Sequence, residues 1–412
     1  MSSSVLVQHL RPGDHVIVGQ ATGEPVGLVR ELFALAPAIG DLHAFCGYSL
    51  NPAWGGSIDD ALRVTTYCGL GTIRRLVERN GARLLPAQLS QLTQWFAAGT
   101  LHCDVILLQV SPADAEGYHS LGYTVDYVWM AIQRARVVLV EVNSQLPHTR
   151  SLCRLHASRV VVARESDTAL PELPEQAPDA AQLGIGRQVA RLVPDGAIVQ
   201  LGIGSFASAI AQALHNHRGL RVRSGMAGDW LPALIASGAI NASDPDACMV
   251  SLAVGTRQLY ESLKRSSDVS FAPLAELVSP EGKAAEAPFI AINSAIEVDL
   301  YGQVNAETIG SRHVGAVSGQ PDYFRAARHS PGGLAIIALP ATTGKEGRSC
   351  LVTRLAGTCV TTAQSDVDFI VTEHGAADVR ATTLNERRAL IAALAAPQFR
   401  TVLTEGEAHV PA

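Results

Sequence analysis

Short, continuous apolar runs constrain the fold of this chain more than any other feature. These runs cover residues 104–110, 137–142, 333–339 and 368–373. They lack the alternation with polar residues of a strand that faces water, and such runs are typical of strands covered on both faces, as in parallel sheets. Helical patterns, as in 205–215 and 385–395, alternate with the runs. The chain is therefore predicted to adopt an α/β fold with mainly parallel sheets.

The length of the chain predicts two domains. Its 412 residues exceed the size at which a single core stops growing, about 250–300 residues. A proline-rich, acidic interval at 168–179 has the composition of a linker. Residues 11–35 and 193–214 begin alike, each with a turn, a short buried strand, a glycine-bearing loop and a helix of small residues. We expect two halves of similar α/β design, residues 1–175 and 181–412.

Charge and hydropathy narrow the possible partners and the compartment. The net charge of −6 at pH 7 gives no electrostatic basis for binding nucleic acid or an anionic membrane. No apolar run approaches the roughly 20 residues that a transmembrane helix needs. The first residues, Met1 to Leu6, lack the basic start and apolar core of a signal peptide. We therefore expect a cytoplasmic protein with no nucleic-acid or membrane partner.

The seven cysteines do not form a recognisable metal or redox motif. They are scattered along the chain, mostly among apolar neighbours, without a C-x-x-C pair or a Cys/His cluster of zinc-site spacing. This pattern favours buried free thiols in a reducing compartment. We expect no metal site.

The stretch 289–310 carries an unusual density of polar side chains. An apolar run at 289–292 ends at Asn293, alternation resumes to a Tyr301-Gly302 turn, and a second strand follows. The pattern predicts a hairpin with amides and carboxylates at its rim. These groups are either used on a ligand or satisfy one another in tight turns. They are Asn293, Glu297, Asp299 and Glu307.

A Gly-x-Gly sequence, Gly202-Ile-Gly204-Ser205, separates a predicted strand from a predicted helix. Glycines there allow close approach of a ligand, and the free N–H groups of a helix N-terminus attract anions. Many such turns only pack a helix on a strand, so a ligand loop and a packing turn both remain open.

Other strand ends are followed by polar loops, at 109–122 and 141–149, as is Thr372-Glu-His-Gly375. Ligands of α/β proteins bind at this carboxyl edge of the sheet, although ordinary loops have a similar composition. Neighbouring residues of a strand point to opposite faces. We therefore expect that Glu373 and His374 do not both reach one substrate.

Taken together, these segments resemble the acetyl-CoA hydrolase/acyl-CoA:carboxylate CoA-transferase family, which includes 4-hydroxybutyrate CoA-transferases. The resemblance runs along nearly the whole chain. It implies two CoA-transferase-type α/β domains with an acyl-CoA site in the interdomain cleft, coenzyme A as part of the substrate or product, and a homodimer or larger assembly. The matching motifs include Gln109-Val-Ser-Pro, Glu116-Gly-Tyr, Glu141-Val-Asn, Leu201-Gly-Ile-Gly-Ser, Ile292-Asn-Ser-Ala-Ile-Glu-Val-Asp, Ile336-Ile-Ala-Leu-Pro and Val371-Thr-Glu-His-Gly.

One departure from the family changes the expected chemistry. Members that transfer CoA resemble one another in a His-Thr-Glu-Met motif, whose glutamate attacks the thioester and becomes a glutamyl-CoA thioester. The similar segment here is Arg223-Ser-Gly-Met-Ala-Gly-Asp229. Gly225 therefore stands where the resemblance places the glutamate, and a glycine cannot attack.

Two further departures concern substrate binding. The family's Gly-x-Gly-Gly-Gln, which resembles an oxyanion and CoA-contact loop, is present as Gly315-Ala-Val-Ser-Gly-Gln320, and its Met-Pro-Arg-Thr as Leu146-Pro-His-Thr149. The second exchange replaces a bidentate guanidinium with an imidazole. The resemblance implies Asn293, as an oxyanion-stabilising amide, and Glu373 as catalytic residues. The substrate- and CoA-binding residues that it implies are Gly202, Gly204, Ser205, Gly225, Ser318, Gly319, Gln320 and His148.

Three functions are compatible with this set of residues. The first is an acyl-CoA enzyme whose nucleophile is water or a group of the substrate, with Asn293 polarising the thioester carbonyl. The second is a CoA-transferase that uses another carboxylate, Glu307 or Glu297. The third is a protein that binds acyl-CoA without turnover.

Overall fold

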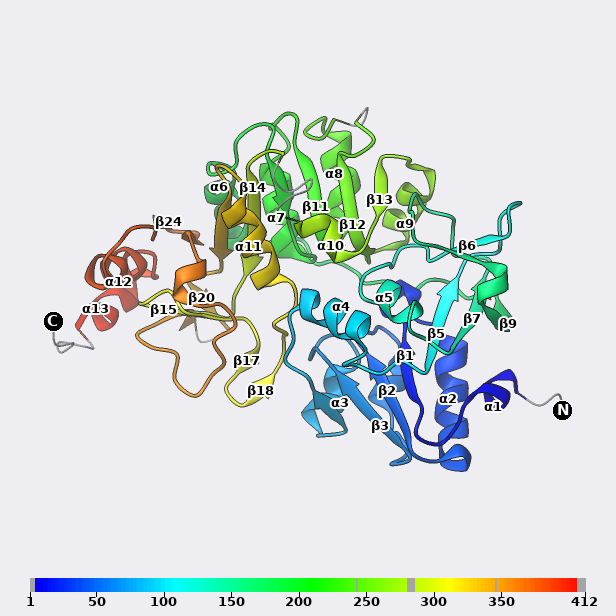
Figure 1. Ribbon diagram of the computed structural model, residues 1–412. Helices are drawn as coiled ribbons and strands as arrows, with labels where there is room; N and C mark the ends of the chain where they lie inside the picture. The colour runs from blue at the N-terminus through cyan, green and yellow to red at the C-terminus, as the bar shows by residue number, and fades with distance from the viewer. Residues whose placement is uncertain (1–3, 242–243, 280–285, 345–346, 406–412) are drawn as a thin grey trace. The chain divides into compact units, whose positions relative to one another are not determined.

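A computed structural model describes residues 4–241, 244–279, 286–344 and 347–405. Two compact units are present (Figure 1), and each is described by itself. The first is built from the chain up to 174 with segments 248–277 and 313–318, and the second from the described parts of 175–247, 278–312 and 319–412. The division near residue 174 falls in the proline-rich interval. The return of two later segments to the first unit had no signal in the sequence.

The first unit contains a seven-stranded sheet in the order β4-β3-β2-β1-β5-β7-β9. Every neighbouring pair is parallel, as the apolar runs predict. All six residues of β5 are buried. The strands are β1 (His15–Val18), β2 (Leu42–Cys46), β3 (Leu62–Thr66), β4 (Ala82–Leu84), β5 (Val105–Val110), β7 (Val137–Asn143) and β9 (Val161–Ser166).

Helices and a small hairpin complete the N-terminal part of this unit. Its helices are α1 (Val5–His9), α2 (Val26–Ile39), α3 (Arg74–Glu78), α4 (Leu89–Ala98) and α5 (Val128–Ile132), and β6 (Tyr118–Ser120) pairs antiparallel with β8 (Arg154–His156). Helix α4 ends at Gly99, whose φ of 77° is the left-handed conformation that glycine adopts without strain.

The segment 248–277 joins the first unit through backbone and side-chain hydrogen bonds. The Tyr123 hydroxyl donates to the carbonyl of Tyr260 at 2.8 Å, and the N–H of Val125 donates to Ser251 O, also at 2.8 Å. The segment holds the parallel strands β12 (Cys248–Ala253) and β13 (Val269–Phe271) and the helices α9 (Arg257–Arg265) and α10 (Leu274–Val278).

The sheet strands of the second unit follow the order β11-β10-β14-β19-β23-β24. The β10–β11, β10–β14, β14–β19 and β19–β23 pairs are parallel, and only β24 runs antiparallel to its neighbour. The strands are β10 (Ile198–Gln200), β11 (Arg221–Ala227), β14 (Phe289–Ser294), β19 (Leu334–Ala338), β23 (Phe369–Thr372) and β24 (Gly375–Asp378). The predicted α/β class with mainly parallel sheets is confirmed.

Several helices pack on this sheet. Helix α11 lies against β14 and β19, and α6 lies against α7, β23 and β24. Capping boxes begin α6 at Asp179 and α12 at Thr383, so the start of each helix is encoded locally. The helices are α6 (Ala180–Ala190), α7 (Ser205–Ala213), α8 (Trp230–Ala236), α11 (Gln320–His329), α12 (Leu384–Ala393) and α13 (Pro397–Glu405).

Short strands follow the main sheet strands of the second unit. Strand β15 (Glu297–Asp299) pairs antiparallel with β16 (Val304–Asn305) and parallel with β22 (Leu351–Val352). Strand β20 (Thr342–Thr343) pairs with β21 (Arg348–Ser349), and β17 (Thr308–Ile309) with β18 (Arg312–His313). The hairpin predicted in 289–310 is confirmed in β15 and β16.

All seven cysteines are free thiols, five of them buried. Within the described ranges, none of the helices has the length and apolar character needed to cross a membrane.

Candidate active site

The candidate residues of the second unit gather at one edge of its sheet. Because β10, β11, β14, β19 and β23 are parallel neighbours, their carboxyl ends meet at the same edge, where α/β proteins bind ligands. Gln200 and Asn293 lie at the ends of β10 and β14, and Glu373 directly follows β23.

Asn293 is held by a buried glutamine. Its Nδ2 donates a hydrogen bond of 2.8 Å to Oε1 of Gln200, which is 3% exposed. A side-chain amide has two N–H donors and an acceptor oxygen. The bond to Gln200 uses one donor and orients the amide, so the second N–H can donate to a carbonyl oxygen of a ligand.

Glu373 lies in a tight turn. Thr372 pairs with Gly375 across the β23–β24 hairpin, so Glu373 and His374 are its two loop residues. Glu373 Oε2 accepts from the N–H of Ala341 at 2.9 Å, and Oε1 lies 3.8 Å from Nε2 of His374. Both residues therefore lie in the turn and not in the strand, so the strand alternation on which the expectation that they do not both reach one substrate was based does not apply to them.

A buried thiol, Cys350, shares the neighbourhood of two carboxylates. Its N–H donates to the carbonyl of Ala341 at 3.0 Å. Burial raises the pKa of Cys350 to about 11, and the negative charges of Glu297 and Glu373 add to the shift. The thiol is therefore protonated at neutral pH and does not act as a thiolate nucleophile.

Some polar groups at the rim of the hairpin form hydrogen bonds with one another and with the backbone of the turn. Asp299 Oδ1 accepts from the N–H groups of Tyr301 and Gln303 at 3.0 and 2.9 Å. Asn305 Nδ2 donates to Thr308 O at 2.8 Å and lies 3.4 Å from Glu297 Oε2. Of the candidate rim groups, Asp299 therefore satisfies the turn, as the second alternative predicts.

Glu307 is also engaged. It is 6% exposed, and its Oε1 accepts from the Thr361 hydroxyl at 2.9 Å. A buried, hydrogen-bonded carboxylate of this kind is poorly placed to attack a substrate.

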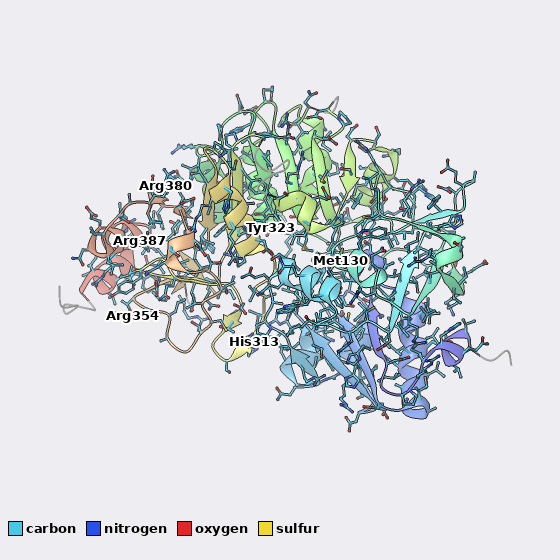
Figure 2. All side chains as sticks on the ribbon, in the orientation of Figure 1. Met130, His313, Tyr323, Arg354, Arg380 and Arg387 are labelled. Atoms are coloured by element: carbon cyan, nitrogen blue, oxygen red, sulfur yellow. The ribbon has the colours of Figure 1, made fainter. Side chains whose placement is uncertain are left out.

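Gly225 lies in β11 directly beneath a tyrosine hydroxyl. A Cβ atom built on Gly225 would come within 2.5 Å of Tyr323 Oη, closer than side chains approach, whereas the next atom, Cζ, would be at an ordinary 3.5 Å. Tyr323 belongs to α11 (Figure 2), is 3% exposed, and stacks on Phe289 with a centroid distance of 6.5 Å. The volume above Gly225 is thus occupied by a fixed phenol.

The Tyr323 hydroxyl is enclosed and poorly satisfied. It faces the backbone of Gly225, but no described group completes a hydrogen bond to Oη. Burial raises the pKa of Tyr323, the charge of Asp322 adds to the shift, and the backbone of Gly225 opposes it. The phenol is therefore neutral throughout the physiological range.

The Gly202–Ser205 loop enters α7. Gly204 is the N-cap residue of α7 and has φ 89°. A glycine has no side chain, so it makes no capping hydrogen bond to the first N–H groups of the helix. A Cβ at Gly202 or Gly204 would meet nothing within 4 Å, so the space over the loop is open. Ser205 Oγ accepts from Gln182 Nε2 at 3.1 Å.

The remaining predicted residues are divided between the units. In the first unit, Ser318 adopts φ 52°, a conformation that favours glycine, and His148 Nε2 lies 2.8 Å from Pro112 O. In the second unit, Gly319 is the N-cap of α11. Gln320 begins that helix, and its buried Nε2 has no partner among the described groups.

Comparison with known proteins decides the family. Residues 1–156 match the acetyl-CoA hydrolase/transferase N-terminal domain, and residues 255–407 match the corresponding C-terminal domain. The 4-hydroxybutyrate coenzyme A transferase of Clostridium kluyveri is 34% identical over 339 residues, which cover 81% of this chain and 79% of that protein. The chain belongs to the acetyl-CoA hydrolase/transferase family.

Solved structures agree with this assignment over almost the whole chain. RipA from Yersinia pestis superposes with a TM-score of 0.86 at 27% identity, covering 98% of this chain and 96% of that chain. A 4-hydroxybutyrate CoA-transferase from Porphyromonas gingivalis has a TM-score of 0.79 at 28% identity, covering 97% and 95%. The similarity therefore extends across both units.

In this member of the acetyl-CoA hydrolase/transferase family, four features of the site had no signal in the sequence. Gln200, which holds Asn293, ends a strand and belongs to no motif. The backbone of Ala341, which binds Glu373, and the thiol of Cys350 carried no motif. Tyr323 follows the Gly319-Gln320 loop, and only the packing of α11 brings it over Gly225.

Proposed function

We propose that this protein hydrolyses acyl-CoA thioesters, or transfers the acyl group within its substrate, without a glutamyl-CoA intermediate. The observation that carries the proposal is the 2.5 Å approach of Tyr323 Oη to a Cβ at position 225. The resemblance places the attacking glutamate at this position. Here the residue is a glycine, and a buried phenol takes up the space next to it.

The groups that remain suit attack by water. A thioester carbonyl bound with its oxygen at the free N–H of Asn293 would be polarised, and a donor aimed at the developing oxyanion lowers the barrier by several kcal/mol. The bond from Asn293 to Gln200 supports this role, because it restricts the amide before substrate arrives.

Glu373 is the candidate general base. Its carboxylate is anchored through Oε2 by the N–H of Ala341. Water would lose a proton to this carboxylate while its oxygen bonds to the carbonyl carbon, and collapse of the tetrahedral intermediate would break the C–S bond. The CoA thiolate leaves and takes up the proton, which gives a free acid and CoA.

A second candidate function is CoA transfer through Glu297. The charge of Glu297 raises the pKa of the Cys350 thiol, as the charge of Glu373 does. Both carboxylates therefore lie near Cys350. Glu307 is the weaker alternative, since Thr361 already binds it.

One assay distinguishes hydrolysis, CoA transfer and binding without turnover. The protein is incubated with a panel of acyl-CoAs, with and without acetate, while free thiol and acyl exchange are followed by mass spectrometry. Thiol release that is independent of acetate supports hydrolysis, and exchange without net thiol supports transfer. Tight binding with neither product would show a silent acyl-CoA-binding protein and contradict the proposal.

A further inference from the structure

A hollow lies on one face of the seven-stranded sheet of the first unit. It is partly open to solvent and has a volume of about 180 Å³, room for several water molecules. That volume suits a small organic molecule and is too small for a whole coenzyme A. The hollow belongs to none of the motifs that led to the active-site proposal.

Strand register places the residues of the hollow on a common face. His15 of β1 lies opposite His43 of β2. In the next row, Ile17 lies opposite Phe45, Phe45 opposite Thr65, and Thr65 opposite Arg83. The covering wall comes from α4 and the turn that follows it, through Phe96, Thr100, Leu101 and His102.

The rim of the hollow is rich in nitrogen donors. The rings of His15 and His43 stack with centroids 4.6 Å apart, and the ring of His102 lies 5.2 Å from His15. Arg83 Nη2 reaches Thr65 Oγ1 at 3.4 Å, a long contact that leaves most of its guanidinium donors for other partners.

The floor is apolar. Ile17 and Phe45 are 2% and 5% exposed, and Phe96 is fully buried. Phe45 and Phe96 meet edge to face with centroids 5.7 Å apart. A ligand that enters the hollow therefore meets donors at the rim and hydrocarbon and aromatic groups below.

The charges around the hollow favour an anion. His15, His43, His102, Arg63 and Arg83 can carry positive charge, and the facing acids are Asp41 and Asp104. Asp41 pairs with Arg63 and lies 3.7 Å from His43 Nε2. Asp104 Oδ2 accepts from the backbone N–H of His15 at 2.8 Å and lies 3.5 Å from the Nδ1 atom of its ring. Burial lowers the pKa of His43, and the positive charges of His15, Arg63 and Arg83 lower it further, against the opposing effect of Asp41.

A shared metal ion fits these residues less well. No set of three His, Cys, Asp or Glu ligand atoms converges at this place in the described chain. Stacked imidazoles present their ring faces, rather than their nitrogen lone pairs, to one another.

We infer that this hollow binds a small monocarboxylate with an apolar body, the carboxylate at Arg83 and the histidine rim and the body on the partly exposed Leu101 and the accessible edges of Ile17 and Phe45. Arg83 would bind the two carboxylate oxygens as a planar fork. The inference rests on the hollow alone and is independent of the proposed reaction.

Hexanoate is the probe, and isothermal titration calorimetry on the full chain is the measurement. Binding of the anion favours protonated histidine at the rim, so lowering the pH from 8 to 6 should tighten it, and the lowered pKa of His43 places its share of the gain toward the acid end of this range. Hexanamide, which keeps the apolar body without the charge, should bind at least tenfold more weakly than hexanoate.

Variants locate the binding. Arg83→Gln and His43→Asn should each weaken hexanoate at least tenfold, whereas Arg30→Gln, an exposed arginine on α2, should not. Asn293→Ala should also leave it unchanged, which separates this hollow from the candidate active site. The inference is overturned if hexanoate fails to bind at pH 6, if hexanamide binds equally well, or if binding survives Arg83→Gln. Equal competition by inorganic phosphate would also overturn it, because the apolar floor would then contribute nothing.

Discussion

The Tyr323 hydroxyl lies where a side chain at position 225 would begin, so any residue larger than glycine there forces a local shift. A Cβ there would lie 2.5 Å from Oη but 3.5 Å from Cζ, so the hydroxyl oxygen alone causes the conflict. Removing that one atom should make room. The lack of a carboxylate at this position therefore depends on two residues, Gly225 on β11 and Tyr323 on α11.

Stability tests this relationship without reference to activity. Gly225→Ala should destabilise the protein by roughly 1–3 kcal/mol, the usual cost of overpacking, and Tyr323→Phe should remove most of that cost in the double variant. Tyr323→Phe alone should cost little, because the hydroxyl has no hydrogen-bond partner among the described groups. Urea unfolding of the four proteins measures the cycle.

Gly202→Ala is the matched control, since a Cβ at that position meets no atom within 4 Å. The contrary result would be that Gly225→Ala lowers the free energy of unfolding equally with tyrosine and with phenylalanine at position 323. The Tyr323 hydroxyl would then not be the group that meets the added Cβ.

Restoring a carboxylate should require the same two changes. Gly225→Glu alone should give little or no acyl exchange with acetate, because the glutamate cannot be seated beside Tyr323. The Gly225→Glu/Tyr323→Phe protein should gain exchange, measured with labelled acetate and mass spectrometry. Equal exchange in the single variant would refute the block by Tyr323, and no exchange in either would show that the departures from the family extend beyond position 225.

The amide of Asn293 should matter for turnover. Asn293→Ala removes the candidate oxyanion donor, and loss of one such donor typically lowers kcat on the order of 100-fold. Thiol release from the best acyl-CoA of the panel gives the rate. Asn385→Ala, at an exposed position on α12, serves as the control, and an unchanged rate for Asn293→Ala would remove its assigned role.

Glu373→Gln tests the general base with little change in structure. The glutamine oxygen can still accept from the N–H of Ala341, so folding should be preserved, but a neutral amide cannot take a proton. The hydrolysis rate should fall about 100-fold or more, with substrate affinity nearly unchanged. A fall confined to KM would instead indicate a binding role.

Cys350 should be unreactive at neutral pH. Its pKa of about 11 lies above the ordinary value because of burial and the charges of Glu297 and Glu373. At pH 8 the thiolate fraction is on the order of 10⁻³, against about a quarter for a free thiol with a pKa near 8.5. Iodoacetamide labelling followed by peptide mass spectrometry should therefore be at least 100-fold slower at Cys350 than at glutathione. Comparable rates would contradict its buried, protonated state.

Local sequence patterns predicted much of the fold, because buried runs and their spacing report directly on strands such as β5, β19 and β23. The hairpin around Tyr301-Gly302 was predicted for the same reason. The turn at Glu373 and His374 was not, since nothing local distinguished a strand ending at Thr372 from one that continues.

The site was predicted only where a motif marked it. Asn293 and Glu373 stand in recognisable segments, but their partner Gln200 comes from another strand and Ala341 from the loop after β19, and contacts between neighbouring strands leave no local trace in the sequence. Tyr323 covers Gly225 because α11 packs where it does. The glycine-like conformation of Ser318 likewise depends on the surrounding loop rather than on the residue type.

The nucleophile is tested most directly by a single turnover in H₂¹⁸O, with enzyme in excess over an acyl-CoA that it hydrolyses. If water attacks the thioester, one ¹⁸O atom should appear in the released acid, while the protein carries neither ¹⁸O nor CoA after digestion and mass spectrometry. A protein-bound CoA adduct, a carboxyl side chain reduced to the alcohol by borohydride with release of CoA, or ¹⁸O in any aspartate or glutamate side chain would show that a protein carboxylate attacks and would contradict the account.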